Sequence, residues 1–114
     1  MSPLRDGREH RVTEAELQDA IAGMARALRW RVAHHRPART EKGWRTAWQY
    51  DGKGLPDLLM VRGRRRVVAE LKGERGKLEH EQAVWLEALD ATAAECHVWR
   101  PSDWISGRVE AVLR

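Results

Sequence analysis

Three ionisable residues stand at positions where a buried strand would normally carry apolar side chains. Asp57 begins one apolar run, and Glu70 and Lys72 lie two positions apart in the next. Because residues two apart in a strand point to the same face, Glu70 and Lys72 project together. If the two runs pair through the turn between them, Asp57 comes level with Glu70. The sequence therefore predicts two carboxylates and an ammonium group on one face of a hairpin.

These side chains suit the hydrolysis of a phosphodiester. Two carboxylates can hold a divalent cation such as Mg²⁺ or Mn²⁺, which prefers oxygen ligands. Such a cation polarises the phosphoryl group and lowers the pKa of a bound water. Lys72 can orient that water or offset the charge that builds up on the phosphate. The alternative is an edge hairpin on which Glu70 and Lys72 form a solvated salt bridge.

The elements that must position these residues follow from hydrophobic periodicity. The predicted elements are helices over 13–28, 79–89 and 101–113, and strands over 30–34, 55–61, 66–72 and 95–99. Residues 36–54 are polar and contain Pro37 and three glycines, so they are expected to form a long loop or an irregular hairpin. The order α-β-β-β-α-β-α predicts an α/β domain whose central mixed β-sheet is flanked by helices.

The composition excludes several classes of protein. A chain of 114 residues is expected to form one domain, here 13–114, preceded by an N-terminal arm over 1–12. The single cysteine, Cys96, allows no internal disulfide and no cysteine-based zinc site. No apolar run approaches the roughly 20 residues that span a bilayer, and the polar N-terminus does not resemble a signal peptide. We therefore expect a cytoplasmic protein with no membrane partner.

The positive charge is concentrated in the middle of the chain. The net charge is +4, but residues 26–80 hold 15 basic and 6 acidic groups. This pattern is typical of a protein that binds a polyanion. The alternative is that the charges only keep the surface of the protein soluble.

Basic residues alternate with aromatic ones just before Asp57, which suits contact with phosphates and stacking on bases. Trp44 or Trp48 could instead cover the core or lie in a dimer interface. The residues expected to contact DNA are Arg36, Arg39, Lys42, Trp44, Arg45, Trp48, Lys53 and Lys77.

The glycine-containing segment 73–77 does not predict a nucleotide site. It lacks the spacing of a Walker A loop and the Ser or Thr that follows its lysine. We therefore expect no nucleotide cofactor.

Several segments resemble one branch of the PD-(D/E)xK nuclease superfamily. They are Gly54 to Val61, the Glu70-Leu71-Lys72 triplet, the pairs Lys77-Leu78, Glu81-Gln82 and Trp85-Leu86, and His97 to Trp104. Together they resemble the VRR-NUC domain in its short stand-alone form, found in phages and bacteria, and the resemblance runs from about 13 to 113. It implies a restriction-endonuclease-like core in a protein of a bacterial or phage-infected host cell.

The resemblance also implies roles for individual residues. Asp57 and Glu70 would be metal ligands, joined by the carbonyl of Leu71, and Lys72 would be the catalytic lysine. Gln82 matches a family glutamine beside the active site, where its amide could orient Lys72 or contact a phosphate. The alternative is that Gln82 is an ordinary exposed helix residue.

The family also places a glutamate of the first helix near the metal. At about 100° per residue, Glu14 lies roughly 50° from the centre of the apolar stripe of that helix, and Glu16 roughly 110°. We therefore favour Glu14 as both a catalytic residue and a metal ligand. The alternative is that both glutamates only stabilise the helix N-terminus.

These features together predict a metal-dependent DNA endonuclease. The chain offers no separate element that reads sequence, so recognition of DNA shape is expected. Stand-alone relatives resemble Holliday-junction resolvases, and cutting two opposed strands favours a homodimer. The alternatives are a flap or nicking endonuclease that works with a replication partner, a non-catalytic DNA-binding module, and a small interaction domain with incidental charge.

Overall fold

The computed structural model describes residues 12–35, 38–40, 43–45 and 50–114, and the side chains of 36–49 lie outside that description. The predicted arm falls almost wholly outside it, except that Val12 packs against the core. The helices are α1 (Glu14–Ala27), α2 (His80–Asp90), α3 (Pro101–Ile105) and α4 (Arg108–Leu113). The strands are β1 (Arg31–His34), β2 (Ala38–Thr40), β3 (Gly43–Arg45), β4 (Leu58–Arg62), β5 (Arg65–Leu71) and β6 (Glu95–Trp99).

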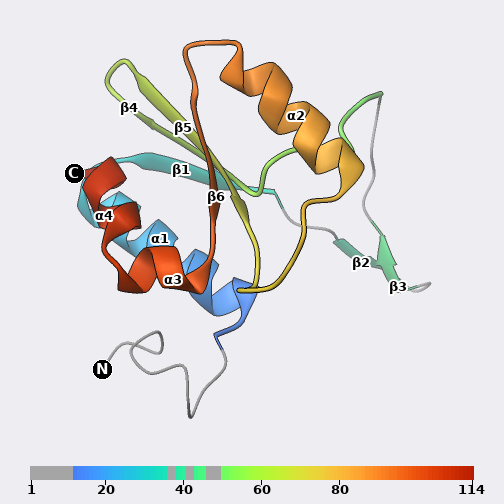
Figure 1. Ribbon diagram of the computed structural model, residues 1–114, viewed down its shortest axis with the longest axis horizontal. Coiled ribbons are helices and arrows are strands. Elements are labelled where there is room, and N and C mark those ends of the chain that lie inside the picture. Colours follow the sequence, from blue (N-terminus) through green and yellow to red (C-terminus); the bar gives the residue numbers. More distant parts are fainter. Residues whose placement is uncertain (1–11, 36–37, 41–42, 46–49) are drawn as a thin grey trace.

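Four strands form one mixed sheet in the order β1-β4-β5-β6, as Figure 1 shows. β4 pairs antiparallel with both β1 and β5, whereas β5 and β6 are parallel. β2 and β3 form a separate antiparallel hairpin, with Ala38 opposite Arg45. The predicted α/β class with a central mixed sheet is therefore confirmed.

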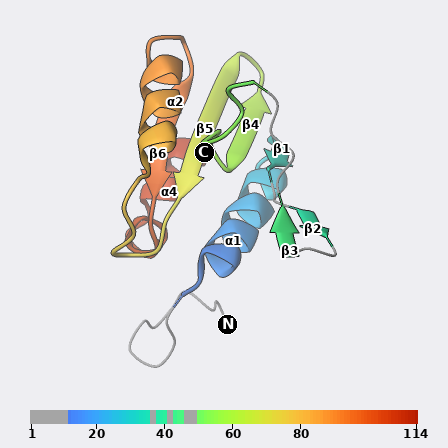
Figure 2. The same cartoon turned by 90° about the vertical axis from the view of Figure 1, so that its right-hand side faces the viewer.

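Helices cover both faces of this sheet. α1, α3 and α4 lie on one face and α2 on the other (Figure 2). The core lies on the α1 side, where Leu58 and Met60 of β4 are fully buried. The alternate residues Leu59 and Val61 point to the other face and are 43% and 39% exposed, because α2 packs mainly over β6. The sheet is thus sealed on one face and only half covered on the other.

The first helix begins where the sequence predicts. The Thr13 hydroxyl accepts the Glu16 N–H, and the Glu16 carboxylate accepts the Thr13 N–H, both at 3.1 Å. This capping box satisfies two donors that the first turn would otherwise leave unpaired. Leu17, Ile21 and Ala25 then follow at helical spacing and are fully buried.

The predicted hairpin between 55–61 and 66–72 is also confirmed. β4 and β5 pair with Leu58 opposite Ala69, and the turn passes through Gly63 at a φ of 61°. That left-handed conformation favours glycine. Extending the register by one residue sets Asp57 level with Glu70, so the pairing itself creates the carboxylate pair.

The element order differs from the predicted one in two places. The polar segment adds the short strands β2 and β3, and the last helix divides into α3 and α4. The division falls at Gly107, whose φ of 85° is left-handed and ends one helical run before the next begins. Ala83, expected in the apolar set of α2, is exposed instead. Within the described ranges, no helix has the length and apolar character needed to cross a membrane.

Candidate active site

Asp57 is held at the junction of three strands. The backbone N–H of Leu71, at the end of β5, donates to Asp57 Oδ2 at 2.8 Å. The N–H of His35, just after β1, donates to the Asp57 carbonyl oxygen at 2.9 Å. The half-buried carboxylate is therefore fixed in place by the backbone of its neighbours.

Glu70 is the buried member of the pair, with 2% of its surface exposed. Its Oε2 accepts a hydrogen bond from Gln82 Nε2 at 2.9 Å and lies 3.7 Å from Lys72 Nζ. Its Oε1 is buried and has no hydrogen-bond partner in the described part of the chain. Because the Lys72 side chain is itself only 12% exposed, the alternative of a solvated salt bridge on an edge hairpin is wrong.

This environment disfavours the charged form of Glu70. Burial raises the pKa of Glu70, the Asp57 carboxylate raises it further, and Lys72 opposes both, so that the pKa reaches about 8. A buried charge is costly unless a cation offsets it, and one lysine does not offset two carboxylates here. Without a further cation, Glu70 therefore holds a proton at pH 7.

Gln82 is oriented from both ends of its amide. Its Oε1 accepts the N–H of Glu79 at 2.9 Å, in the first turn of α2. That contact directs the Nε2 group toward Glu70. The alternative that Gln82 is merely an exposed helix residue is therefore wrong, and α2 contributes one polar group to the carboxylate site.

Glu14 lies beside this site but touches a different group. Its Oε1 accepts the N–H of Gly73 at 3.3 Å, where the loop after β5 reaches the beginning of α1 (Figure 1). Glu16 is committed to the capping box, so Glu14 is the glutamate that faces the loop after Lys72. Leu71 joins the site through its backbone, since its side chain is buried in the core.

The donor set fits a cation that keeps several water ligands. Among the residues that the structure describes, no group of three or more His, Cys, Asp or Glu side chains is arranged to hold a metal ion. Mg²⁺ is commonly bound through one or two carboxylates, with waters and substrate phosphates completing its shell. The unpartnered Glu70 Oε1 beside Asp57 meets that requirement.

The residues predicted to contact DNA are only partly described. Lys53 and Lys77 are exposed, on the loops before β4 and before α2. Arg39 stands opposite Trp44 in the β2–β3 hairpin, and Arg45 belongs to the same hairpin, with their side chains outside the description. Arg36, Lys42 and Trp48 lie outside the described residues altogether.

Sequence reasoning missed two contacts that hold the loops around the site. Arg100 Nη1 donates to the carbonyl oxygens of Gly73 and Gly76 at 2.7 and 2.6 Å, which braces the loop after Lys72. Trp85 Nε1 donates to the carbonyl oxygen of Asp51 at 2.7 Å, which ties α2 to the loop before β4. Each joins segments far apart in the chain, so no local pattern could have indicated them.

Gly54 allows the loop before β4 to lie directly against α2. A Cβ at Gly54 would lie 2.5 Å from the backbone carbonyl carbon of Glu81, and the φ of 88° already disfavours any side chain. We expect Gly54→Ala to lower the free energy of unfolding by about 2–4 kcal/mol, measured by urea denaturation.

The matched control is the other glycine-to-alanine change, Gly23→Ala within α1. A Cβ there meets no atom within 4 Å, so alanine should stabilise the helix by about 0.5–1 kcal/mol. If Gly54→Ala and Gly23→Ala change the free energy of unfolding by the same amount and in the same direction, the role assigned to Gly54 is wrong.

Comparisons with protein-family models, with curated proteins and with solved structures gave no match for this chain. The function must therefore be argued from the geometry and chemistry of the site.

Proposed function

We propose that this protein is a divalent-metal-dependent endodeoxyribonuclease of the PD-(D/E)xK type, with a restriction-endonuclease-like core and a substrate of branched DNA. The observation that carries the proposal is the pair Asp57 and Glu70. Glu70 is buried, its Oε2 lies 3.7 Å from Lys72 Nζ, and its Oε1 has no hydrogen-bond partner among the described residues. A buried arrangement of this kind costs stability unless it serves a ligand, and the ligand that suits two carboxylates is a hard cation. The resemblance to VRR-NUC domains supports the same residues in the same roles.

Asp57 and Glu70 would hold Mg²⁺ or Mn²⁺, with the Leu71 carbonyl oxygen as a further ligand. Glu14, whose Oε1 accepts the Gly73 N–H at 3.3 Å, would reach the cation through a bound water. When bound, the cation would polarise the scissile phosphate and lower the pKa of the attacking water. Glu70 would bind the cation in its ionised form; the Gln82 amide donates to Oε2, which would leave Oε1 available as a ligand.

Lys72 would act on the charge of the reacting phosphate. Its ammonium lies 3.7 Å from Glu70 Oε2 and is largely shielded from water, which strengthens its electrostatic effect. From that position Lys72 can orient the attacking water or stabilise the negative charge that develops on the phosphate. Gln82 holds Glu70 in place, so its effect on Lys72 is indirect.

A resolvase cuts two opposed strands, so the proposal includes a homodimer with one such site in each protomer. The test uses purified protein and a labelled synthetic four-way junction with Mg²⁺, with Mn²⁺ and with a chelator, beside a linear duplex and a flap. We expect paired symmetric cuts in the junction alone, lost with the chelator.

Each of the other possible results of this experiment supports a different function. Cutting of flaps or plain duplex would retain the nuclease and exclude the resolvase. Binding that weakens steeply as salt rises, without any cutting, would indicate a non-catalytic DNA-binding module. Neither binding nor cutting would leave the chain as an interaction domain with incidental charge.

A further inference from the structure

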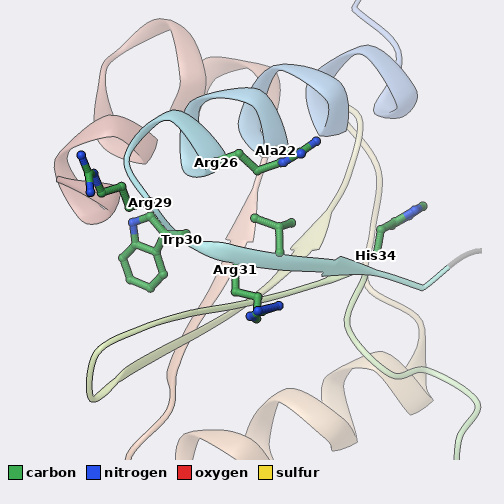
Figure 3. A pocket seen from close by; sticks show the side chains of 7 residues that line it. Ala22, Arg26, Arg29, Trp30, Arg31 and His34 are labelled. Atoms are coloured by element: carbon green, nitrogen blue, oxygen red, sulfur yellow. The ribbon is translucent and has the colours of Figure 1, made fainter.

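A groove runs along the exposed edge of the sheet between α1 and β1. It encloses about 630 Å³ and is shown in Figure 3. Its lining residues include no acid; they are Ala22, Arg26, Arg29, Trp30, Arg31, Val32 and His34. Figure 3 shows Arg26 on α1 and His34 on β1 on the same side of the strand, with Arg31 on the other side and Arg29 at the far end. We call this feature the edge groove.

Within the part of the chain that the structure describes, the arginines of the edge groove have no side-chain partner, unlike the nearby Arg62 and Arg65. Arg26, Arg29 and Arg31 make no side-chain hydrogen bond or ion pair with the described residues. In contrast, Arg62 Nη1 donates to the carbonyl oxygens of Leu28 and Leu113 at 3.1 and 3.0 Å.

Arg65 is also fully engaged, although it lies over the same Trp30 ring as Arg62. Its Nε and Nη2 donate to the Glu95 carboxylate at 2.9 and 2.7 Å, and Nη2 also donates to the Val112 carbonyl oxygen at 2.8 Å. Two arginines at this corner therefore stabilise the fold, whereas the three in the groove contribute positive charge that nothing in the described chain offsets.

Arg29 occupies a position that ordinarily favours glycine. The N–H of Trp30 donates to the carbonyl oxygen of Ala25, and the N–H of Arg29 to that of Arg26, which is the Schellman arrangement at a helix end. That arrangement places Arg29 at a φ of 71°. A non-glycine residue is strained there, so folding alone would select glycine at this site. An arginine at this strained position is consistent with a use for its charge.

The strand that lines the edge groove ends beside Asp57. β1 is an edge strand of the four-stranded sheet, and its far end is tied to Asp57 by the His35 N–H. The strand advances about 3.3 Å per residue, and one strand of DNA presents a phosphate about every 3.4 Å along the duplex axis. The four residues of β1 span about 10 Å, a length that accommodates a short stretch of one DNA strand.

We propose that the edge groove binds the phosphodiester backbone of the DNA that enters the candidate active site, with Arg26, Arg29 and Arg31 as the contacts. This inference rests on the proposed function, because the DNA is taken to be the substrate. It adds a binding surface on α1 and β1 to the one expected from the basic loop and the β2–β3 hairpin.

The test measures DNA binding in a chelator, so that its outcome does not depend on cleavage. The groove variant carries Arg26→Ala, Arg29→Gly and Arg31→Ala. Each change should weaken binding to a junction by about fivefold, and all three together by about 100-fold. The slope of log affinity against log salt should fall by about three.

The control variant removes the same charge elsewhere, through Arg64→Ala, Arg108→Ala and Arg114→Ala. Arg108 and Arg114 are paired with Asp103 and Glu110, and Arg64 lies in the β4–β5 turn. Equal losses of affinity in the two variants, or wild-type affinity in the groove variant, would overturn the proposal.

Arg29→Gly alone separates binding from folding. Because glycine relieves the left-handed strain, this variant should melt at the wild-type temperature or above it while binding DNA less tightly. Unchanged DNA affinity in this stable variant would remove Arg29 from the groove. If the wild-type protein binds DNA through the groove but cuts none of the substrates, the proposed nuclease activity is wrong and the proposed DNA-binding groove is still supported.

Discussion

Asp57→Asn is expected to reduce DNA cleavage by about 10³-fold or more while leaving DNA binding and folding intact. Asparagine keeps a side-chain oxygen that can accept the Leu71 N–H, now made with Asp57 Oδ2 at 2.8 Å. What it removes is the negative charge that would hold the cation beside Glu70. Lys72→Ala should abolish cleavage in the same way, because its ammonium is the buried positive charge nearest the pair.

The measurements are cleavage rates at saturating DNA with Mg²⁺ or Mn²⁺, and DNA affinity in a chelator. Asp51→Asn is the matched control, because Asp51 is an exposed carboxylate of the same loop and only its carbonyl oxygen is used, by Trp85. Wild-type cleavage by Asp57→Asn or Lys72→Ala would refute the assigned roles. Loss of DNA binding with normal metal uptake would show that the two residues act in binding rather than in catalysis.

The metal-free protein should lose stability as the pH rises from about 4.5 to about 8. The pKa of Glu70 is raised to about 8 in the folded protein, from an ordinary value of 4.5. Below pH 4.5 the Glu70 carboxyl is protonated in both the folded and the unfolded protein, so it does not lower the free energy of unfolding. Between these pH values the unfolded chain releases the proton and the folded chain keeps it, so unfolding becomes progressively easier. A shift of this size corresponds to about 5 kcal/mol at most.

Glu70→Gln isolates this contribution, because glutamine cannot titrate and can still accept the Gln82 amide. Urea denaturation at pH 5, 6.5 and 8 in a chelator should show a steeper loss for the wild type than for Glu70→Gln. Added Mg²⁺ at pH 8 should restore stability to the wild type alone, since cation binding requires the ionised carboxylate. Parallel pH profiles for the two proteins would contradict the buried, protonated state of Glu70.

The central hairpin was predictable because several local signals agree there. Two apolar runs flank a turn, and their spacing allows one register that buries the apolar side chains. The side-by-side placement of Asp57 and Glu70 follows from that register alone. The commitment of Glu16 to the capping box was likewise predictable from Thr13, whereas the role of Glu14 at a metal stays a prediction. What remained unpredictable at this end of the sheet was how deeply Glu70 is buried, which depends on α2.

The missed features depend on backbone conformation and on how neighbouring elements pack, which hydrophobic periodicity does not report. The break at Gly107 was not visible because a glycine inside an apolar helical pattern is often tolerated. The apolar spacing of α2 suggests a buried Ala83, but α2 packs mainly over the edge strand β6 and Ala83 is exposed. The edge groove is lined by Arg26 of α1 and by Arg31 of β1. Hydrophobic periodicity predicts each element separately and does not predict how α1 and β1 lie relative to one another.

The packing of α2 has a consequence for how the protein moves. None of its residues is fully buried, and it rests on β6 and on the loop held by Trp85. Such an element can detach at a lower free energy than the unfolding of the whole domain. When it does, Gln82 leaves Glu70 and water reaches the carboxylate, while the core on the α1 side stays closed. The helix that completes the site is therefore also the part of the fold best able to open it.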